Sequence, residues 1–428
     1  MTHDQPRARQ DDHASVPLRL LMVSSDTYPP TRVDVAVMFG VELAARGHRT
    51  DLILQSEATC PKSYVTAWGG GRVWVGATDL GSSLLSRIHK HIRGILADMK
   101  LFSWMRSGSY DIIIIKDKFL SGIMALLAAT LFKKRCVYWL SYPFPESYME
   151  RARDGTARYP LLYLIRGRTF NLLLYKVLLP AADHVFVQSE QMRRDVAALG
   201  ISAAKMTVVP MGVQAKMFPG AVNRAGRRML PADVPCIVYL GTLARIRRLD
   251  FLLRVLLQVL QVKPAAKLYL VGRGDEPGDE QFLLEQARAL GVEQALVLTG
   301  QLPQSEALQF VAEADVCVSP FRPTPVLNST SPTKLIEYMA MGKAVVANDH
   351  PEQRSLIAAS GAGLCVPYEE HGFAAAVLQL LDDRELAVQM GQRGRKYVLE
   401  HRSYRVIADK LEQELSQIAH GLYASNEQ

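Results

Sequence analysis

The sequence predicts an α/β protein made of two doubly wound domains that face each other across a cleft. Two observations lead to this fold class. Short apolar runs alternate with stretches of helical period along both halves of the chain, as in parallel sheets covered by helices. A segment with Gly, Pro and little periodicity, residues 213–235, separates the halves as a linker. Because open parallel sheets bind ligands at the carboxyl ends of their strands, function is expected on the loops that follow strands.

The N-terminal half, residues 17–212, shows the alternation of βαβ units. Residues 1–16 are polar and lack an apolar core, so we expect a disordered tail and no signal peptide. All strands of this half are expected to pair in parallel, because helical stretches separate them. The expected strands are LRLLMV, TDLIL, DIIII, CVYWL and HVFVQS, and the expected helices cover 35–46, 88–105 and 119–132.

The C-terminal half, residues 236–402, repeats the alternation, and its sheet is again expected to be parallel. Residues 403–428 are expected to form a helix that packs back toward the N-terminal domain. The expected strands of this half are CIVYLG, KLYLVG, ALVLTG, DVCVSP, AVVAN and GLCVP.

The composition argues against several classes of protein. With 49% hydrophobic and 21% charged residues over 428 positions, the chain is expected to be globular. Its five cysteines form no CxxC pair, which argues against a zinc site and a disulfide framework and favours a reduced, cytoplasmic location. No apolar run is long enough to span a bilayer, since Arg166, Arg168 and Lys176 interrupt the nearest candidate, residues 161–179.

The formal net charge of +8 favours anionic partners. Nucleotide phosphates, an anionic membrane surface and nucleic acid are all compatible with this charge. No aromatic platform or nucleic-acid-binding motif accompanies it, so a nucleic-acid partner is not expected.

The segment NSTSPTKLIEYMAMGK predicts a helix with well-marked ends. Ser331 suits the N-cap, Pro332 suits the first helical position, and Gly342 suits the position just past the helix end. The segment follows an expected strand, so the helix begins at the carboxyl edge of the sheet.

The start of this helix is a candidate anion site. The backbone N–H groups of Thr333, Lys334 and Leu335 have no partner within the helix and lie at the positive end of its dipole. Lys334 adds a full positive charge, so a diphosphate fits here. Glu337 follows one turn later on the same face, where a ribose diol fits beside the anion. The alternative is an ordinary capped helix with an exposed lysine and glutamate.

The same segment resembles the retaining glycosyltransferases of family 4, which carry an SPxKxxEYMAxGxPVVA stretch. The resemblance implies the GT-B fold, with two Rossmann-like domains, and a reaction that retains the anomeric configuration. It also implies that the helix N-terminus binds the donor diphosphate and that Glu337 binds the ribose hydroxyls. The chain departs from the family pattern at Ser329, where the wider family usually has a glutamate that contacts the transferred sugar.

The segment YLGTLARIRRLDFLL is similar to a second family motif, GxLxxxKGLD, in which a basic pair clamps the diphosphate. Arg247 takes the place of the lysine. Thr242 stands where the family usually has an arginine, so the second charge is expected from Arg245 or Arg248. The alternative is a solvated basic loop. The other donor-side residues implied by the resemblance are Gly241, Gly272, Leu302 and Ser331.

Four residues are expected on the acceptor side. The loop SSDTYPPTRVDVAV lacks the glycine pair of many relatives, and Arg32 and Asp34 occupy this region. Arg32 is expected either to contact donor or acceptor or to form an interdomain ion pair. The loop WLSYPFPES resembles the family's HDxxPE segment, which makes Glu146 a candidate, and Asp117 in IKDKF is another. His48, in a stretch similar to the family's RGHxVxVxT, is expected to be structural.

The expected catalytic residues are Arg247, Lys334 and Glu337. Helix N–H groups and the two cations can stabilise charge on the departing phosphate, and no DxD motif lies in a donor loop, so neither a metal nor another cofactor is expected. The expected donor is a UDP-, GDP- or ADP-sugar, and the expected acceptor is a glycan, glycolipid or polyprenyl-linked sugar. The main alternative is a non-catalytic nucleotide-sugar-binding or scaffold protein, because Ser329, Thr242 and the missing glycine pair depart from the family pattern.

The segment SRIHKHIRGILADMKLFSWMR predicts a basic amphipathic helix, with Ile88, Ile92, Ile95 and Met99 on one stripe. Two interpretations stay open. The helix either docks on the anionic inner face of a membrane or covers the sheet with a basic outer face. The surrounding basic residues are Arg87, Lys90, Arg93, Lys100 and Arg106.

Overall fold

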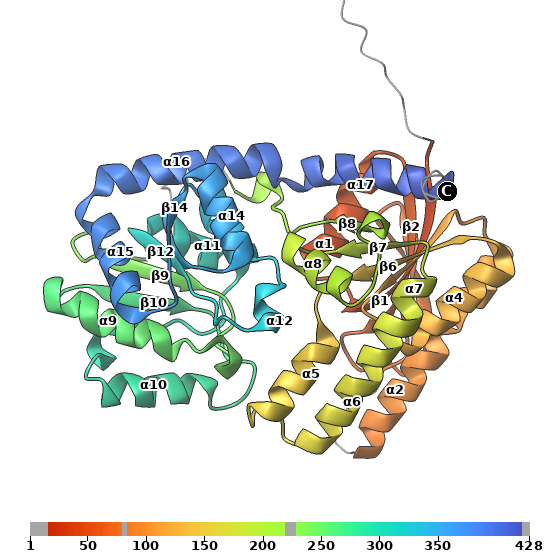
Figure 1. The fold of residues 1–428 in the computed structure, drawn as a ribbon, viewed down its shortest axis with the longest axis horizontal. Coiled ribbons are helices and arrows are strands. Elements are labelled where there is room, and N and C mark those ends of the chain that lie inside the picture. Colours follow the sequence, from red (N-terminus) through yellow and green to blue (C-terminus); the bar gives the residue numbers. More distant parts are fainter. Residues whose placement is uncertain (1–15, 79–83, 219–227, 422–428) are drawn as a thin grey trace, which may run out of the picture.

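The computed structural model describes residues 16–78, 84–218 and 228–421. Two α/β domains lie side by side, each a sheet with helices on both faces (Figure 1). This confirms the predicted fold class. In both domains the central strands are fully buried and read as nearly continuous apolar runs, as in IIII of residues 112–115, because helices cover both faces of the sheet.

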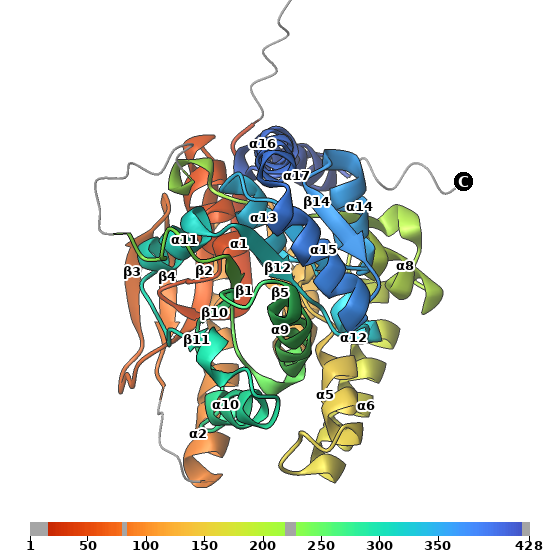
Figure 2. The ribbon, with the colours of Figure 1, turned by 90° about the vertical axis from the view of Figure 1, so that its left-hand side faces the viewer.

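The N-terminal sheet has eight strands in the order β3-β4-β2-β1-β5-β6-β7-β8. Neighbouring strands are parallel except β3 and β4, so the prediction of a wholly parallel sheet was wrong at this edge (Figure 2). Gly69 and Gly70 both have positive φ, which suits the tight turn of a two-residue hairpin. The strands are β1 (Arg19–Tyr28), β2 (Arg49–Ser56), β3 (Tyr64–Trp68), β4 (Gly71–Gly76), β5 (Ile112–Lys116), β6 (Arg135–Leu140), β7 (His184–Val187) and β8 (Met206–Val208).

The helices of the N-terminal domain follow the expected alternation, with one break. The single helix expected over 88–105 is interrupted at Met99, next to the buried Asp98, whose carboxylate accepts a hydrogen bond from Lys118 Nζ at 2.6 Å. The helices are α1 (Val33–Ala36), the π-helix η1 (Met38–Leu43), α2 (Leu84–Asp98), α3 (Lys100–Ser107), α4 (Leu120–Phe132), α5 (Phe144–Arg153), α6 (Pro160–Leu173), the π-helix η2 (Leu174–Leu178), α7 (Leu179–Ala181), α8 (Glu190–Ala198) and the 3-10 turn η3 (Ala203–Lys205).

The C-terminal sheet has six strands in the order β11-β10-β9-β12-β13-β14, all parallel as predicted. The strands are β9 (Cys236–Leu240), β10 (Lys267–Val271), β11 (Leu296–Leu298), β12 (Val316–Ser319), β13 (Val345–Asn348) and β14 (Gly363–Val366). The helices are α9 (Asp250–Val262), α10 (Asp279–Ala289), α11 (Gln304–Glu313), α12 (Pro325–Asn328), α13 (Thr333–Ala340), α14 (Pro351–Ser360), α15 (Glu370–Asp382) and α16 (Arg384–His401), with short 3-10 turns η4 (Ala215–Met217), η5 (Arg245–Arg247) and η6 (Glu293–Ala295).

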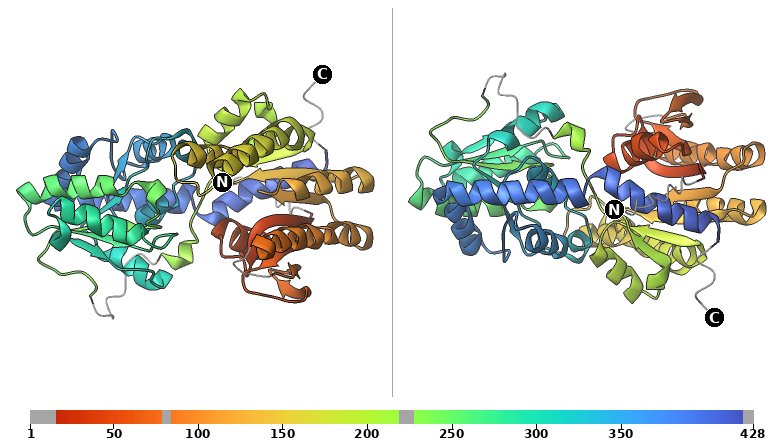
Figure 3. Two further views of the ribbon diagram at one scale, coloured as in Figure 1. Left: turned by 90° about the horizontal axis from the view of Figure 1, so that it is seen from below. Right: turned by 90° about the horizontal axis from the view of Figure 1, so that it is seen from above.

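The last helix, α17 (Tyr404–Ala419), leaves the C-terminal domain and packs on the N-terminal one. Figure 3 shows α16 and α17 in succession along both domains. Ile407 and Leu411 of α17 are buried in the same core as Leu20 and Phe39. His48 Nδ1 accepts a hydrogen bond from Leu18 N at 3.0 Å, and its Nε2 lies 2.9 Å from Glu412 Oε1, so His48 joins α17 to the domain.

Among the described residues, no helix combines the length and the apolar character that a membrane crossing requires. The apolar stretch 161–179 is divided between α6, η2 and α7.

Candidate functional site

Helix α13 begins at the carboxyl edge of the C-terminal sheet, but its cap differs from the prediction. Pro332, with φ −80° and ψ 87°, occupies the cap position, and within the described chain no side chain caps the helix. Ser331 is therefore not the N-cap; its Oγ accepts a hydrogen bond from Met211 N at 3.2 Å and donates one to Glu352 Oε1 at 3.1 Å. The first N–H groups of α13, from Thr333 onward, remain at the positive end of the helix. Gly342 follows the helix end with φ +70°, as predicted.

Two cations meet beside this helix start. Lys334 Nζ lies 4.5 Å from the centre of the Phe321 ring and 5.0 Å from that of Tyr239. The Arg247 guanidinium lies 5.8 Å from the centre of the same Phe321 ring. Burial and, next, repulsion from Arg247 hold the pKa of Lys334 well below its ordinary value. An anion bound beside this pair would therefore favour the charged form of Lys334.

Glu337 lies one turn further along α13. Burial raises the pKa of Glu337 to about 7, although the nearby Lys334 acts in the opposite direction. The carboxyl group therefore changes charge near neutral pH, next to the cationic pair.

The loops after β9 and β10 lie against each other and form the floor beside the helix start. Gly241 N donates to Val271 O at 3.0 Å, and a Cβ on Gly272 would lie 2.1 Å from Gly241 O, so only glycine fits at position 272. Both glycines have positive φ, +145° and +142°. The loops border a pocket of about 460 Å³, a size typical of small-ligand sites. Its lining includes Gly241, Thr242, Gly272, Arg273 and Leu302.

Arg245 and Arg248 are engaged away from the cationic pair. Arg245 Nε lies 3.6 Å from Asp279, and Arg248 Nε lies 2.9 Å from Asp250. Arg248 has φ +50°, which turns its side chain toward the start of α9. Both arginines expected to supply a second charge are thus paired with carboxylates, whereas Lys334 accompanies Arg247 at the helix start.

Ser329 joins the loop before α13 to the N-terminal domain. Its buried Oγ donates to the carboxylate of Asp195 on α8, and its carbonyl accepts a hydrogen bond from Ser189 Oγ at 2.6 Å. Ser189 also accepts from Met192 N at 2.9 Å and so caps α8. Asp195 was not predicted from the sequence, because no local pattern connects positions 134 residues apart.

In the N-terminal domain, charged side chains gather where β1 and β5 end. Lys116 is fully buried, and its Nζ lies 3.1 Å from Asp26 and 3.3 Å from Asp34. Arg32 reaches the same two carboxylates, at 3.6 and 3.2 Å. Among the described residues, the ion pairs of Arg32 are thus with Asp26 and Asp34 of its own domain, so the alternative of an interdomain pair is not seen there. Despite burial, Lys116 and then Arg32 hold the pKa of Asp34 below its ordinary value.

Asp117 and Glu146 lie on two further loops of this side. Asp117, with φ +54°, accepts hydrogen bonds from the backbone and hydroxyl of Ser141, and burial raises its pKa. Glu146 Oε1 accepts from Asn171 Nδ2 at 2.9 Å, and burial raises the pKa of Glu146 as well. Asp117 belongs with the Arg32 group, since both Arg32 and Lys116 lower its pKa against the effect of burial. Glu146 instead neighbours Asp195.

Two family models match the chain and together cover both domains. Residues 34–212 match the "Glycosyl transferase 4-like domain", and residues 234–383 match "Glycosyl transferases group 1". The chain belongs to the family 4 glycosyltransferases of GT-B fold. The resemblance seen in the sequence is thereby confirmed.

Curated proteins and solved structures are similar to this family 4 member at low identity. A D-inositol 3-phosphate glycosyltransferase of Kineococcus radiotolerans is 28% identical over 50% of this chain and 52% of its own. The chain spans about half the length of the first such relatives that it matches. A GDP-mannose-dependent α-(1-6)-phosphatidylinositol monomannoside mannosyltransferase of Mycobacterium tuberculosis is 24% identical over 92% of this chain and 97% of its own. The sucrose-phosphate synthase of Thermosynechococcus elongatus has the same fold, with a TM-score of 0.74 and 20% identity over 94% of this chain and 100% of that one.

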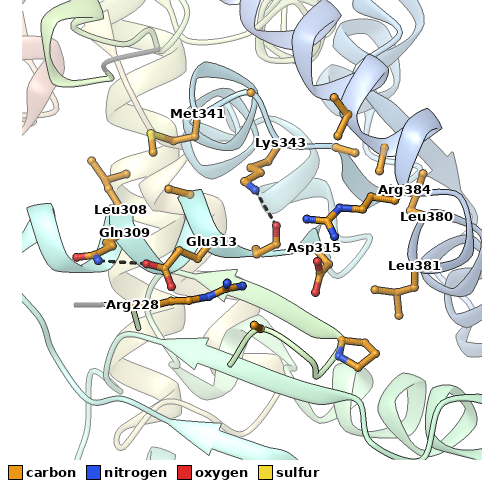
Figure 4. A pocket seen from close by; sticks show the side chains of 18 of the residues that line it. Arg228, Leu308, Gln309, Glu313, Asp315, Met341, Lys343, Leu380, Leu381 and Arg384 are labelled. Carbon is orange, nitrogen blue, oxygen red and sulfur yellow. Dashed lines mark hydrogen bonds between the residues drawn. The ribbon is translucent and has the colours of Figure 1, made fainter. Parts of the chain in front are cut away.

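A second, larger pocket of this GT-B protein lies at the opposite edge of the C-terminal sheet, before the strands (Figure 4). Several of its polar side chains already have partners. Glu313 accepts from Met229 N and Leu230 N, both at 2.8 Å, and Lys343 Nζ donates to Ala314 O at 2.7 Å. These bonds hold the domain together, so the cationic pair at α13 remains the better candidate site. Among the described residues, no three His, Cys, Asp or Glu side chains are placed to hold a metal ion.

Proposed function

We propose that this glycosyltransferase moves a sugar from a nucleotide-sugar to a hydroxyl group of a glycan or lipid-linked acceptor, with retention and without a metal. One observation carries the proposal: Arg247 and Lys334 meet beside the uncapped start of α13. Two cations and a row of N–H groups suit a nucleoside diphosphate, which is the leaving group of such a reaction. Because these groups are already in place, they stabilise the charge that develops on the departing oxygen.

The neighbouring residues have roles that follow from this placement. The N–H groups of Thr333 and Leu335 and the Lys334 ammonium bind the diphosphate, and Glu337 accepts hydrogen bonds from the ribose hydroxyls. The base occupies the pocket between Gly272 and Leu302. Ser331 and Ser329 hold the donor loop in position through the bonds that they make to Glu352 and Asp195.

The acceptor enters from the N-terminal side of the cleft. Arg32 and Asp34 belong to the buried charge cluster at the end of β1, and Asp117 lies beside them. The buried carboxylate of Glu146, which accepts a hydrogen bond from Asn171 Nδ2 and also interacts with Tyr175, can accept a further hydrogen bond from an acceptor hydroxyl. The mycobacterial relative is named for a phosphatidylinositol monomannoside, which supports a lipid-linked acceptor here.

A peripheral location on the inner face of a membrane belongs to the same proposal. Ile92 on α2 and Met99, just after this helix, are exposed, which supports the membrane interpretation of the basic segment, while Gly94 and the buried Ala97 pack toward β2 and β4. The side chains of Arg87 and Ile88 lie outside the described residues.

The donor assignment is tested by calorimetry with UDP, GDP and ADP as ligands. Arg247→Ala and Glu337→Ala are each expected to weaken binding of the preferred nucleotide by tenfold or more, since each loses a charged contact worth about 1.5–3 kcal/mol. Arg288→Ala is the matched control, because Arg288 pairs with Glu293 on the surface of the same domain. Unchanged affinity in both site variants contradicts the assignment.

Turnover separates an enzyme from a non-catalytic binding protein. A thermal-shift screen with UDP-, GDP- and ADP-sugars selects the donor, because a ligand of the folded state raises apparent stability. Release of the nucleoside diphosphate from that donor in the presence of lipid or glycan acceptors is the expected result. A different result identifies a scaffold protein. In that case wild type binds the donor tightly but releases no nucleoside diphosphate, and Arg247→Ala does not bind the donor.

A further inference from the structure

Helix α4 has an unusual surface for a helix of a globular domain. Its sequence, LSGIMALLAATLF, contains no charged side chain, and a helix that is apolar all round is normally buried. Its inner face, with Ala125 and Ala128, is buried against the sheet. Its outer face is open to solvent, and the exposed leucines Leu127 and Leu131 are 60% and 68% accessible. None of the described residues covers this outer face, so a separate partner surface is expected there.

Helix α6 also carries exposed apolar side chains. Leu161, Leu162, Ile165 and Leu172 are all exposed, Leu161 to 71%. The two helices are neighbours, because Phe119, just before α4, stacks on Phe170 of α6 with ring centres 4.4 Å apart. Figure 1 shows α4 on the side of the N-terminal domain that is turned away from the C-terminal domain.

The charge around these helices has a single sign. Residues 118–145 and 155–182 contain no Asp or Glu. Exposed cations flank the leucines: Lys133 follows α4, Arg166 and Arg168 lie on α6, and Lys176 lies on η2. Self-association through this surface would bring like charges together, whereas a surface of anionic lipid complements them.

We propose that the outer surfaces of α4 and α6, here called the α4–α6 face, dock the protein on an anionic lipid bilayer. The leucines enter the boundary between headgroups and acyl chains, and the flanking arginines and lysines reach the lipid phosphates. The proposal deepens the membrane part of the proposed function and moves the main contact from α2 to α4 and α6.

The position of α6 connects this face to the acceptor side of the cleft. Asn171 of α6 donates to Glu146 of α5, while the next residue, Leu172, is exposed. One helix thus contacts the acceptor side with one surface and the bilayer with the other. A lipid-linked acceptor in the membrane is then held close to Glu146, so docking supplies substrate to the site.

Vesicle flotation tests the proposal with the full-length chain. Vesicles of phosphatidylglycerol mixed with phosphatidylcholine are compared with pure phosphatidylcholine, at low and at high salt. Wild type is expected to float with the anionic vesicles at low salt and to float much less at high salt or with pure phosphatidylcholine. The double variant Leu127→Glu/Leu161→Glu is expected to lower the lipid-bound fraction at least tenfold, and Arg166→Gln/Lys176→Gln is expected to reduce the salt dependence.

Matched controls keep the outcomes distinct. Val262→Glu places the same charge on an exposed apolar position of α9 in the other domain and is expected to float as wild type does. The nucleotide affinity of each variant reports on the donor site, and its thermal midpoint reports on the fold. Both are measured without lipid, so a failure of the proposed function is distinguished from a failure of membrane docking. Absence of wild type from the lipid fraction at both salt concentrations overturns the proposal, as does equal flotation of the Leu127→Glu/Leu161→Glu variant. A wild-type dimer that this variant makes monomeric overturns it in favour of a contact between two copies.

Discussion

Lys334 Nζ lies 4.5 Å from the centre of the Phe321 ring, and the guanidinium of Arg247 approaches the same ring at 5.8 Å. The ring face attracts both cations and keeps them close although they repel each other. Burial and this repulsion lower the pKa of Lys334. The site therefore carries more positive charge after an anion has bound than before.

Proton uptake on nucleotide binding follows from this relationship. A bound diphosphate favours the charged lysine and raises its pKa, so binding at pH 8 is expected to take up a fraction of a proton, and affinity is expected to fall as pH rises further. Calorimetry with UDP, GDP or ADP in two buffers of different ionisation enthalpy measures the uptake. At pH 8 Glu337 is already largely ionised and contributes little. Equal heats in both buffers, or uptake that persists in Lys334→Met, would exclude Lys334 as the group that gains the proton.

Glu337→Gln is expected to change how stability depends on pH. In the folded protein the pKa of Glu337 is about 7, above its ordinary 4.5, so the folded state binds this proton more tightly than the unfolded state. Its contribution to stability is complete below pH 4.5 and is lost as pH rises through 7. The loss at pH 8 is at most about 3 kcal/mol. The thermal midpoint of wild type minus that of Glu337→Gln should thus decrease from pH 5 to pH 8. The same difference for the exposed control Glu400→Gln should show no such trend.

Much of the fold could be predicted because burial on both faces gives the strands a simple apolar pattern. The edge hairpin of β3 and β4 was missed, although Gly69 and Gly70 between two alternating stretches are a recognised turn signal. The break of the basic helix at Met99 has no comparable local signal.

The site was predictable where one segment carries it and unpredictable where two segments meet. Lys334 and Glu337 share a helix, so their spacing places them together. Ser331 was assigned as a cap because its type and position suit one, but its hydroxyl bonds to Met211 and Glu352 instead. Pairs such as Ser329 with Asp195 depend on how the domains pack, which no local pattern encodes.

Gly272→Ala is expected to destabilise the C-terminal domain and to abolish nucleotide binding. The added Cβ would lie 2.1 Å from Gly241 O, and φ is +142°, so the two loops of the donor pocket must separate. Gly278→Ala is the matched control, since Gly278 also has positive φ, +100°, but its Cβ would meet no atom within 4 Å. The control should lose only the conformational term of about 1–2 kcal/mol and keep its nucleotide affinity. Denaturant unfolding measures the free energy of unfolding of both variants. An equal loss of this free energy in both would show that the close approach of the two loops does not make the substitution at position 272 more destabilising.

The hydrogen bond from Ser329 to Asp195 is expected to couple the donor loop to the N-terminal domain. Ser329→Ala leaves the Asp195 carboxylate with Gln191 Nε2, at 2.8 Å, as its remaining hydrogen-bond donor, and Asp195→Ala leaves a buried hydroxyl without its acceptor. A double-mutant cycle on thermal stability should give a coupling free energy of about 1–3 kcal/mol, the range for a hydrogen bond to a charged group. Asp195→Asn, which keeps an acceptor oxygen but not the charge, should lose less stability than Asp195→Ala.

Because the loop also positions α13, the single variants should weaken nucleotide binding as well, whereas Thr130→Ala on the surface of α4 should leave nucleotide binding unchanged. Additive effects of the two alanine variants on both stability and affinity would mean that this contact does not hold the donor loop.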